Sequence, residues 1–168
     1  MRGYLMSLNE LQGAAAKAGK LDVGDLVMGM HKKVWSDEYE DDDRICFVGK
    51  LWHGLHLLFA ESAWEPTPGL GELFMGGTEV GEDLGYGPAR YHSPASVKRF
   101  DDELRTLTDD ALRERFSPEA FADANAYPQI WDESKEDLWR ELSHYIGALR
   151  LLLEGTRGRG EGLVVAIL

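Results

Sequence analysis

Hydrophobic and polar positions along the chain follow a pattern that predicts a mixture of helices and strands. Tyr4-Leu5-Met6 is typical of a short opening strand, and the apolar run over 163–168 is typical of a strand buried on both faces. Stripes of apolar residues at helical spacing lie between these two strands. The predicted fold class is therefore α+β. We expect a single domain over 1–168, with a small sheet that includes the N- and C-terminal strands and is packed by several helices.

The clearest helical stripe in the first half covers residues 44–61, where apolar side chains recur at intervals of three and four. The longest predicted helix covers about 133–154, with Asp132 or Ser134 as its cap and Gly155 as its end. Further helices are expected over 9–18, over 22–35, and after the cap-proline pairs Ser93-Pro94 and Ser117-Pro118.

Glycines gather in the middle of the chain, where seven of the nineteen lie between Gly69 and Gly87. This concentration of glycines predicts a long loop, or a set of short strands and turns, that needs positive φ at several glycines. Acidic residues within the same stretch disfavour a phosphate-binding loop. The functional alternative makes Tyr86, Arg90 and Tyr91 the rim of a small polar pocket, in which Arg90 holds an anionic group.

Charge and composition exclude several classes of protein. With 18 basic and 30 acidic residues, the net charge is −12, so the chain has no spare cations for nucleic acid or for an anionic membrane surface. Cys46 is the only cysteine, which rules out an intrachain disulfide and favours a reducing compartment, the cytoplasm. Six acids in the segment Asp37–Asp43 predict a solvated loop or a helix start. Calcium binding is the weaker alternative, because the spacing of an EF-hand loop is missing.

His53 and His56 are three residues apart on the predicted 44–61 helix, close enough to share a metal ion such as zinc. A third ligand would be needed, and Glu61, His92 and His144 are the candidates. The structural alternative is that both histidines form hydrogen bonds within the fold. No motif identifies a cofactor, and the sequence leaves both alternatives open.

Three functional hypotheses follow from these features. The first is a non-enzymatic cytoplasmic binding or interaction protein whose acidic surface meets a protein partner or a cationic ligand, because no complete catalytic set is present. The second is a small-molecule-binding protein or enzyme with a pocket between the 44–61 helix and the 76–91 glycine-rich loop. There His53 or His56 acts as acid or base, Arg90 holds an anion and Tyr86 orients it. The third is a metal site on the two histidines.

Several segments, in the same order along nearly the whole chain, carry a resemblance to a known family. They are Gly3-Tyr4, Leu51-Trp52-His53-Gly54-Leu55-His56, Gly76-Gly77-Thr78, Gly85-Tyr86-Gly87-Pro88-Ala89-Arg90-Tyr91 and Ala126-Tyr127-Pro128-Gln129-Ile130-Trp131, followed by the apolar terminal strand. On these motifs the chain resembles the YfbM-like family, small bacterial proteins grouped as a domain of unknown function. It departs from that family at Leu58-Phe59-Ala60-Glu61, where relatives tend to have Leu-Leu-Thr-Gly. The resemblance implies a single α+β domain and brings no reaction with it.

Overall fold

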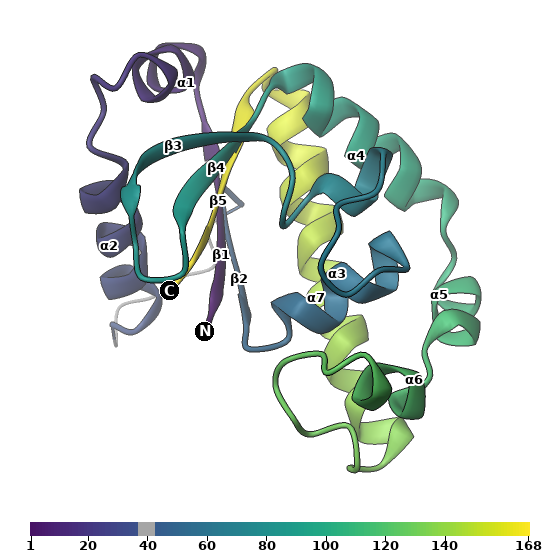
Figure 1. The fold of residues 1–168 in the computed structure, drawn as a ribbon. Coiled ribbons are helices and arrows are strands. Elements are labelled where there is room, and N and C mark those ends of the chain that lie inside the picture. The colour runs from purple at the N-terminus through teal and green to yellow at the C-terminus, as the bar shows by residue number, and fades with distance from the viewer. Residues whose placement is uncertain (37–42) are drawn as a thin grey trace.

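The computed structural model of the chain describes residues 1–36 and 43–168. The predicted acidic loop, with its calcium alternative, falls mainly on 37–42 and so lies outside the described residues. The strands are β1 (Gly3–Leu8), β2 (Ile45–Gly49), β3 (Thr78–Asp83), β4 (Pro88–His92) and β5 (Gly162–Ile167). They form one antiparallel sheet in the order β2-β1-β5-β4-β3, which runs through the centre of the molecule (Figure 1).

Helices cover both faces of the sheet. They are α1 (Glu10–Lys17), α2 (Val23–Val34), α3 (Trp52–Ala60), the 3-10 turn η1 (Gly69–Glu72), α4 (Pro94–Thr106), α5 (Asp109–Arg115), α6 (Pro118–Asp123) and α7 (Lys135–Gly158). Figure 1 shows α1 and α2 on one face, α3, α4 and α7 on the other, and α5 and α6 at the end away from the sheet. The predicted α+β fold, with both terminal strands in the sheet, is confirmed. Among residues 1–36 and 43–168, none of the helices has the length and hydropathy that crossing a membrane demands.

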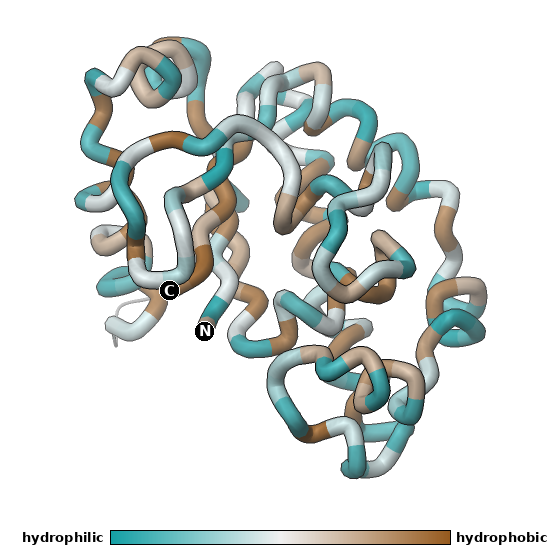
Figure 2. The backbone as a smooth tube through the Cα atoms, in the orientation of Figure 1, coloured by the Kyte–Doolittle hydropathy of each residue, from teal (hydrophilic) through white to brown (hydrophobic). Residues whose placement is uncertain are grey.

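β5 separates two hydrophobic cores, because successive side chains of a strand point to opposite faces. Leu163 and Val165 pack in the larger core with α3, α4 and α7. Val164 and Ala166 pack in the smaller core with α1 and α2. Figure 2 shows hydrophobic residues concentrated along the central strands and hydrophilic residues on the outer turns. The prediction of a C-terminal strand buried on both faces is therefore confirmed.

The prediction of one helix over 44–61 is wrong in its first part, because β2 occupies residues 45–49 and pairs with β1. Cys46 and Val48 point into the larger core, and Gly49, with a φ of 55°, turns the chain toward α3. In a short, densely apolar run the same residues satisfy a spacing of two and a spacing of three or four. Only the pairing with β1 distinguishes the strand from the helix.

The longest helix also differs from its predicted end, because α7 passes through Gly155 and continues to Gly158. The chain leaves the helix at Gly160, whose φ is 66°. The amide of Glu161 donates to the carbonyl of Thr156 at 3.0 Å, which is the hydrogen bond of a Schellman motif. Gly160 supplies the left-handed residue that ends the helix. Gly155 is therefore not needed as the end and lies within the helix.

The glycine-rich segment over 66–88 contains η1, β3 and the turn into β4. β3 and β4 form a hairpin with an irregularity in the pairing between Val80 and Asp83. Gly81, Gly85 and Gly87 all have positive φ, as the sequence predicted for this stretch. The segment is therefore a structured hairpin rather than one long loop.

Candidate functional site

The five residues selected from the sequence do not share one environment. His53 and His56 are both fully buried on α3, with ring centroids 6.3 Å apart. Tyr91 belongs to the smaller core, on the opposite side of the sheet. Arg90 lies on the other face of β4 from Tyr91, and Tyr86 is 60% exposed at the hairpin turn. The structure brings the two histidines together and does not bring all five residues into one pocket.

His53 uses both ring nitrogens to hold neighbouring loops in place. The amide of Tyr127 donates to Nδ1 at 3.0 Å, so Nδ1 carries no hydrogen and Nε2–H donates to the carbonyl of Ala63 at 2.5 Å. The ring of Trp64 covers the imidazole at a centroid distance of 4.3 Å. Burial lowers the pKa of His53, against the opposing effect of the bond to Ala63. His53 is therefore a neutral side chain that connects α3 to two loops.

His56 is different, because neither of its ring nitrogens has a hydrogen-bond partner within the described part of the chain. Burial, and to a smaller extent the repulsion that would arise if His53 were protonated as well, lowers the pKa of His56 to about 4. The imidazole is therefore neutral near pH 7, with one donor and one acceptor. The Nε1–H of Trp52, one turn earlier on α3, also lacks an acceptor among residues 1–36 and 43–168.

The three residues considered as a third metal ligand do not join the histidine pair. His92 lies on β4, where its Nε2 bonds the carbonyl of Leu73 at 2.9 Å and burial lowers its pKa to about 4. Glu61 follows the end of α3, and His144 is exposed on α7. Within the described residues, no group of three or more His, Cys, Asp or Glu side chains is placed to hold a metal ion. A metal at the histidine pair would also have to displace the hydrogen bonds of His53.

The two remaining candidates on β4 are held by neighbouring protein groups. Arg90 donates to the carboxylate of Glu79 at 3.1 Å, across the β3–β4 hairpin. The hydroxyl of Tyr91 fills space left by two glycines: a Cβ would lie 2.6 Å from it at Gly13 and 2.5 Å from it at Gly162. Burial raises the pKa of Tyr91. The ion pair with Glu79 therefore accounts for the position of Arg90, and close packing against Gly13 and Gly162 accounts for that of Tyr91.

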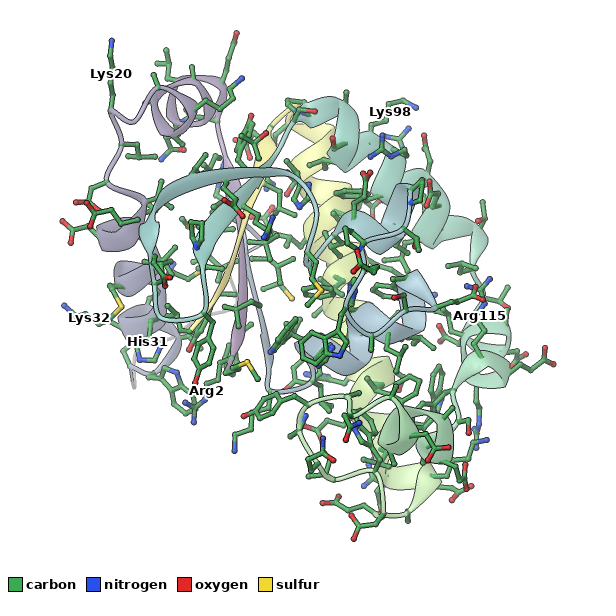
Figure 3. All side chains as sticks on the ribbon, in the orientation of Figure 1. Arg2, Lys20, His31, Lys32, Lys98 and Arg115 are labelled. Carbon is green, nitrogen blue, oxygen red and sulfur yellow. The ribbon has the colours of Figure 1, made fainter. Side chains whose placement is uncertain are left out.

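An aromatic cluster covers the smaller-core face of the sheet beside β2. The hydroxyl of Tyr4 shares a hydrogen bond of 2.6 Å with Nδ1 of His31 and accepts one of 3.3 Å from Nε1–H of Trp35. Trp35 packs edge-on against Phe47 at a centroid distance of 5.6 Å, and the guanidinium of Arg2 lies 5.6 Å from the Trp35 ring centre. Figure 3 shows Arg2 and His31 close together near the end of α2. Trp35 is nevertheless 58% exposed, so the cluster presents an aromatic surface to solvent.

A cleft of about 440 Å³ adjoins this cluster, between α1, α2 and the β1–β2 pair. Met6 and Ile45 supply its apolar part. At its rim, Arg44 donates to Glu161 at 2.7 Å. Burial opposes ionisation of Glu161, but the hydrogen bonds from Arg159 and Arg44 outweigh it and lower the pKa of this carboxyl. The full lining is Met6, Ser7, Asn9, Gln12, Lys33, Arg44, Ile45 and Glu161.

A second, smaller groove of about 270 Å³ lies between the end of α3 and the short helices α5 and α6. Leu57, Leu58 and Phe121 make it mainly apolar. At its mouth Arg115 and Glu61 form an ion pair of 3.4 Å between two exposed side chains. Because such exposed pairs contribute little and neutralise each other, the groove offers no strong anchor for a charged ligand.

Sequence reasoning missed the surface formed by Trp35, Phe47 and β2. Ile45–Gly49 is apolar without alternation up to its glycine, so the sequence has no period-two pattern to mark a strand, and its spacing runs on into the helical spacing of α3. Nothing in the sequence places Trp35 beside Phe47, because that contact depends on how α2 packs across the sheet. The buried nitrogens of Trp52 and His56, which have no partner within 1–36 and 43–168, likewise follow only from tertiary packing.

Comparisons with known proteins identify a family whose description assigns no activity. A family model described as a domain of unknown function (DUF1877) matches residues 1–166. Among solved structures, the chain is similar to "a Protein of Unknown Function YfbM from Escherichia coli", with a TM-score of 0.66, 16% identity and 100% of both chains covered. At this identity the likeness shows the fold alone. No curated protein matches the chain. The comparisons confirm the resemblance drawn from the sequence and name no reaction.

Proposed function

Because the chain belongs to the domain of unknown function family DUF1877, whose description assigns no reaction, we propose a function from the geometry of its surface. The protein is a non-enzymatic, cytoplasmic binding protein that pairs an extended segment of a basic partner protein with the outer edge of β2. The observation that carries this proposal is the contrast between the two edges of the sheet.

The two edge strands differ in the features that keep sheet edges from pairing. β3 carries Glu79, Glu82 and Asp83 and an irregular pairing with β4, and charges and irregularities of this kind block strand addition. β2, with the sequence Ile-Cys-Phe-Val-Gly, has no charged residue and no proline. Of the two edges, β2 is therefore the one suited to accept another strand.

The backbone of β2 presents hydrogen-bonding groups on its outer side. The amide of Ser7 donates to the carbonyl of Arg44 at 2.9 Å, which fixes Arg44 as facing β1. Since backbone groups alternate along an antiparallel strand, Ile45 and Phe47 face away from β1. Within the described residues, no further strand lies beyond β2. An added strand would therefore pair with the N–H and C=O groups of Ile45 and Phe47.

Side chains next to this edge supply apolar contacts for an added strand. Ile45 and Phe47 are half-buried on the smaller-core face, and Trp35 is 58% exposed beside Phe47. The cleft of about 440 Å³ begins at Ile45 and Met6. Alternate side chains of an incoming strand would project toward Trp35 and toward this cleft. Backbone pairing then gives affinity, and the cleft gives selectivity.

Overall charge favours a basic partner over a second copy of the chain. Two copies, each with a net charge of −12, repel one another, whereas a cationic protein is attracted at long range. Near the cleft itself, Arg44 and Arg159 are paired with Glu161 and Asp43. Charge therefore acts mainly on the rate of encounter, and the strand contacts act on the lifetime of the complex.

The experiment selects ligands without assuming a natural partner. A displayed library of random peptides of about ten residues, the upper length of ordinary strands, is selected against the folded protein. Dissociation constants of the selected peptides are then measured for the native chain, for Ile45→Lys and Trp35→Ala on the β2 side, and for Thr78→Lys as the matched control on β3. Circular dichroism confirms that each variant is folded.

We expect peptides of alternating apolar pattern and net positive charge, whose dissociation constants rise at least about tenfold in Ile45→Lys and Trp35→Ala. Thr78→Lys keeps the native affinity, and added salt weakens binding. Failure to select any peptide contradicts the proposal, as does a peptide that binds Ile45→Lys as tightly as the native chain. Sedimentation showing a dimer that Ile45→Lys dissociates would replace the peptide with a second copy and overturn it as well.

A further inference from the structure

Three buried ring nitrogens on α3 have no hydrogen-bond partner in the part of the chain that the structure describes. Four buried side-chain nitrogen or oxygen atoms lack a hydrogen bond within residues 1–36 and 43–168, and three of them belong to Trp52 and His56. Trp52 is 3% exposed and His56 is fully buried. Leaving such a donor or acceptor unsatisfied is unfavourable, because on burial the group loses the hydrogen bonds that it makes to water in the unfolded chain. Because native proteins satisfy nearly all buried polar groups, this concentration on one helical turn requires an explanation.

The neighbouring polar rings show how the fold usually treats such groups. His53 bonds Ala63 and Tyr127, and the indole Nε1–H of Trp131 donates to the carbonyl of Ala126 at 2.6 Å. Trp52 and His56 therefore stand apart from comparable rings in the same core. Among the described residues, their lack of protein partners is local to one face of α3.

Trp52 and His56 are one turn apart, so their side chains leave the helix on the same side. The ring of Trp52 lies 6.4 Å from that of Phe74, and Ala60, a further turn along, packs against Gly71 of η1. The two polar rings are therefore enclosed between α3 and the segment that includes η1 and Phe74. Their surroundings are too enclosed for bulk solvent to serve as the partner.

The hydrogen-bonding inventory defines what can occupy this position. The indole of Trp52 offers one donor, and a neutral imidazole at His56 offers one donor and one acceptor. The occupants must together accept from two N–H groups and donate to one nitrogen, and because the two nitrogens of one imidazole point apart, more than one molecule is needed. An anion accepts but does not donate, so it would leave one nitrogen of a neutral His56 unsatisfied. Water accepts and donates, and it is the smallest group that does both.

We propose that α3 contains an internal hydration site, in which one buried water accepts a hydrogen bond from Trp52 Nε1–H and bonds one ring nitrogen of His56, while a second water bonds the other ring nitrogen. This site is independent of the edge of β2, because it lies in the larger core on the opposite face of the sheet from Trp35. Water there joins α3 to the segment that covers it. The otherwise unpaired nitrogens then become part of the hydrogen-bonded core.

The test is the exchange of magnetisation between water and indole protons in solution NMR. The Nε1 proton of Trp52, assigned with Trp52→Phe, should show a cross-peak with water whose NOE has the sign of a long-lived, buried molecule. Trp131 is the matched control, because its Nε1–H is equally buried and already bonded to Ala126. Its proton should show no such cross-peak.

His56→Phe keeps an aromatic ring while removing both nitrogens, and it should reduce the Trp52 cross-peak at least about twofold, because the water loses its other partner. Absence of the Trp52 cross-peak in the native protein contradicts the proposal, as does equal intensity at Trp131. If His56→Phe fails to fold, the comparison of the two native indoles still decides the result. Mass spectrometry of the denatured protein provides a second check, because release of one equivalent of a small organic molecule would identify a different occupant and overturn the proposal.

Discussion

Acidification should destabilise the fold in a pH range set by its buried histidines. Burial lowers the pKa values of His56 and His92 from 6.5 to about 4. Below pH 6.5 the unfolded chain therefore binds protons at both positions, while the folded chain remains neutral there until about pH 4. Their contribution to the free energy of unfolding is therefore fully present above pH 6.5 and decreases as the pH drops toward 4. Below about pH 4 these two groups cause no further decrease.

The size of the effect follows from the shift in each pKa. A change from 6.5 to about 4 at one site corresponds to a loss of about 3 kcal/mol, so the two sites together account for about 6 kcal/mol. That sum is comparable with the whole free energy of unfolding of an ordinary domain, about 5–15 kcal/mol. Carboxyl groups with lowered pKa values, such as Glu161, act below their usual value of 4.5 and so affect a lower pH range.

The assay is urea unfolding followed by tryptophan fluorescence at several pH values between about 7 and about 4. His92→Gln should be less stable near neutral pH, and its free energy of unfolding should fall less steeply with decreasing pH than that of the native chain. His144→Gln, at an exposed position on α7, is the matched control and should keep the native slope. A native slope in His92→Gln, or a free energy of unfolding that stays constant from pH 6.5 down to about 4, would refute this reasoning.

Two pairs of substitutions test the packing and charge on the larger-core side of the sheet. Gly54→Ala should lower the free energy of unfolding by about 1–3 kcal/mol, because a Cβ there would lie 2.6 Å from Cη2 of Trp131. Gly147→Ala, where no atom lies within 4 Å of the added Cβ, should instead raise it by about 0.5–1 kcal/mol; both are measured by urea unfolding, and equal effects would contradict the packing. Asp101→Asn should cost about 2 kcal/mol, because the carboxylate of Asp101 is buried between two arginines. Asp102→Asn, at a carboxylate 45% exposed, should have a clearly smaller effect because solvent screens its ion pairs, and thermal unfolding of both variants separates the two sites.

Much of the fold was predictable because its local signals agree with its tertiary structure. The cap at Ser134 and the apolar stripe that follows it lead to α7, and the uninterrupted run after Gly162 leads to a strand buried on both faces. β2 was not predictable in the same way, since its short apolar run satisfies either period until β1 pairs with it. The end of α7 was misplaced because Gly155 and Gly160 are both glycines, and only the second has positive φ.

The candidate site was less accessible to sequence reasoning than the fold. The pair His53 and His56 was correctly placed on one helix, but the sequence does not say that His53 bonds two loops while His56 has no protein partner among the described residues. Tyr91 and Arg90 are neighbours in sequence, and because their segment forms strand β4, their side chains lie on opposite faces of the sheet and do not share a pocket. The β2 edge depends on strand order, which local patterns do not encode.

The most direct test of the proposed binding edge is amide hydrogen exchange along β2 in the free protein, resolved by NMR. The amides of Ile45 and Phe47 face away from β1, whereas the amide of Cys46 faces it. We predict that Ile45 and Phe47 exchange at least about tenfold faster than Cys46 and become protected when a selected peptide binds. Exchange at Ile45 and Phe47 as slow as at Cys46 in the free protein would show that the edge is already covered, and would contradict the account.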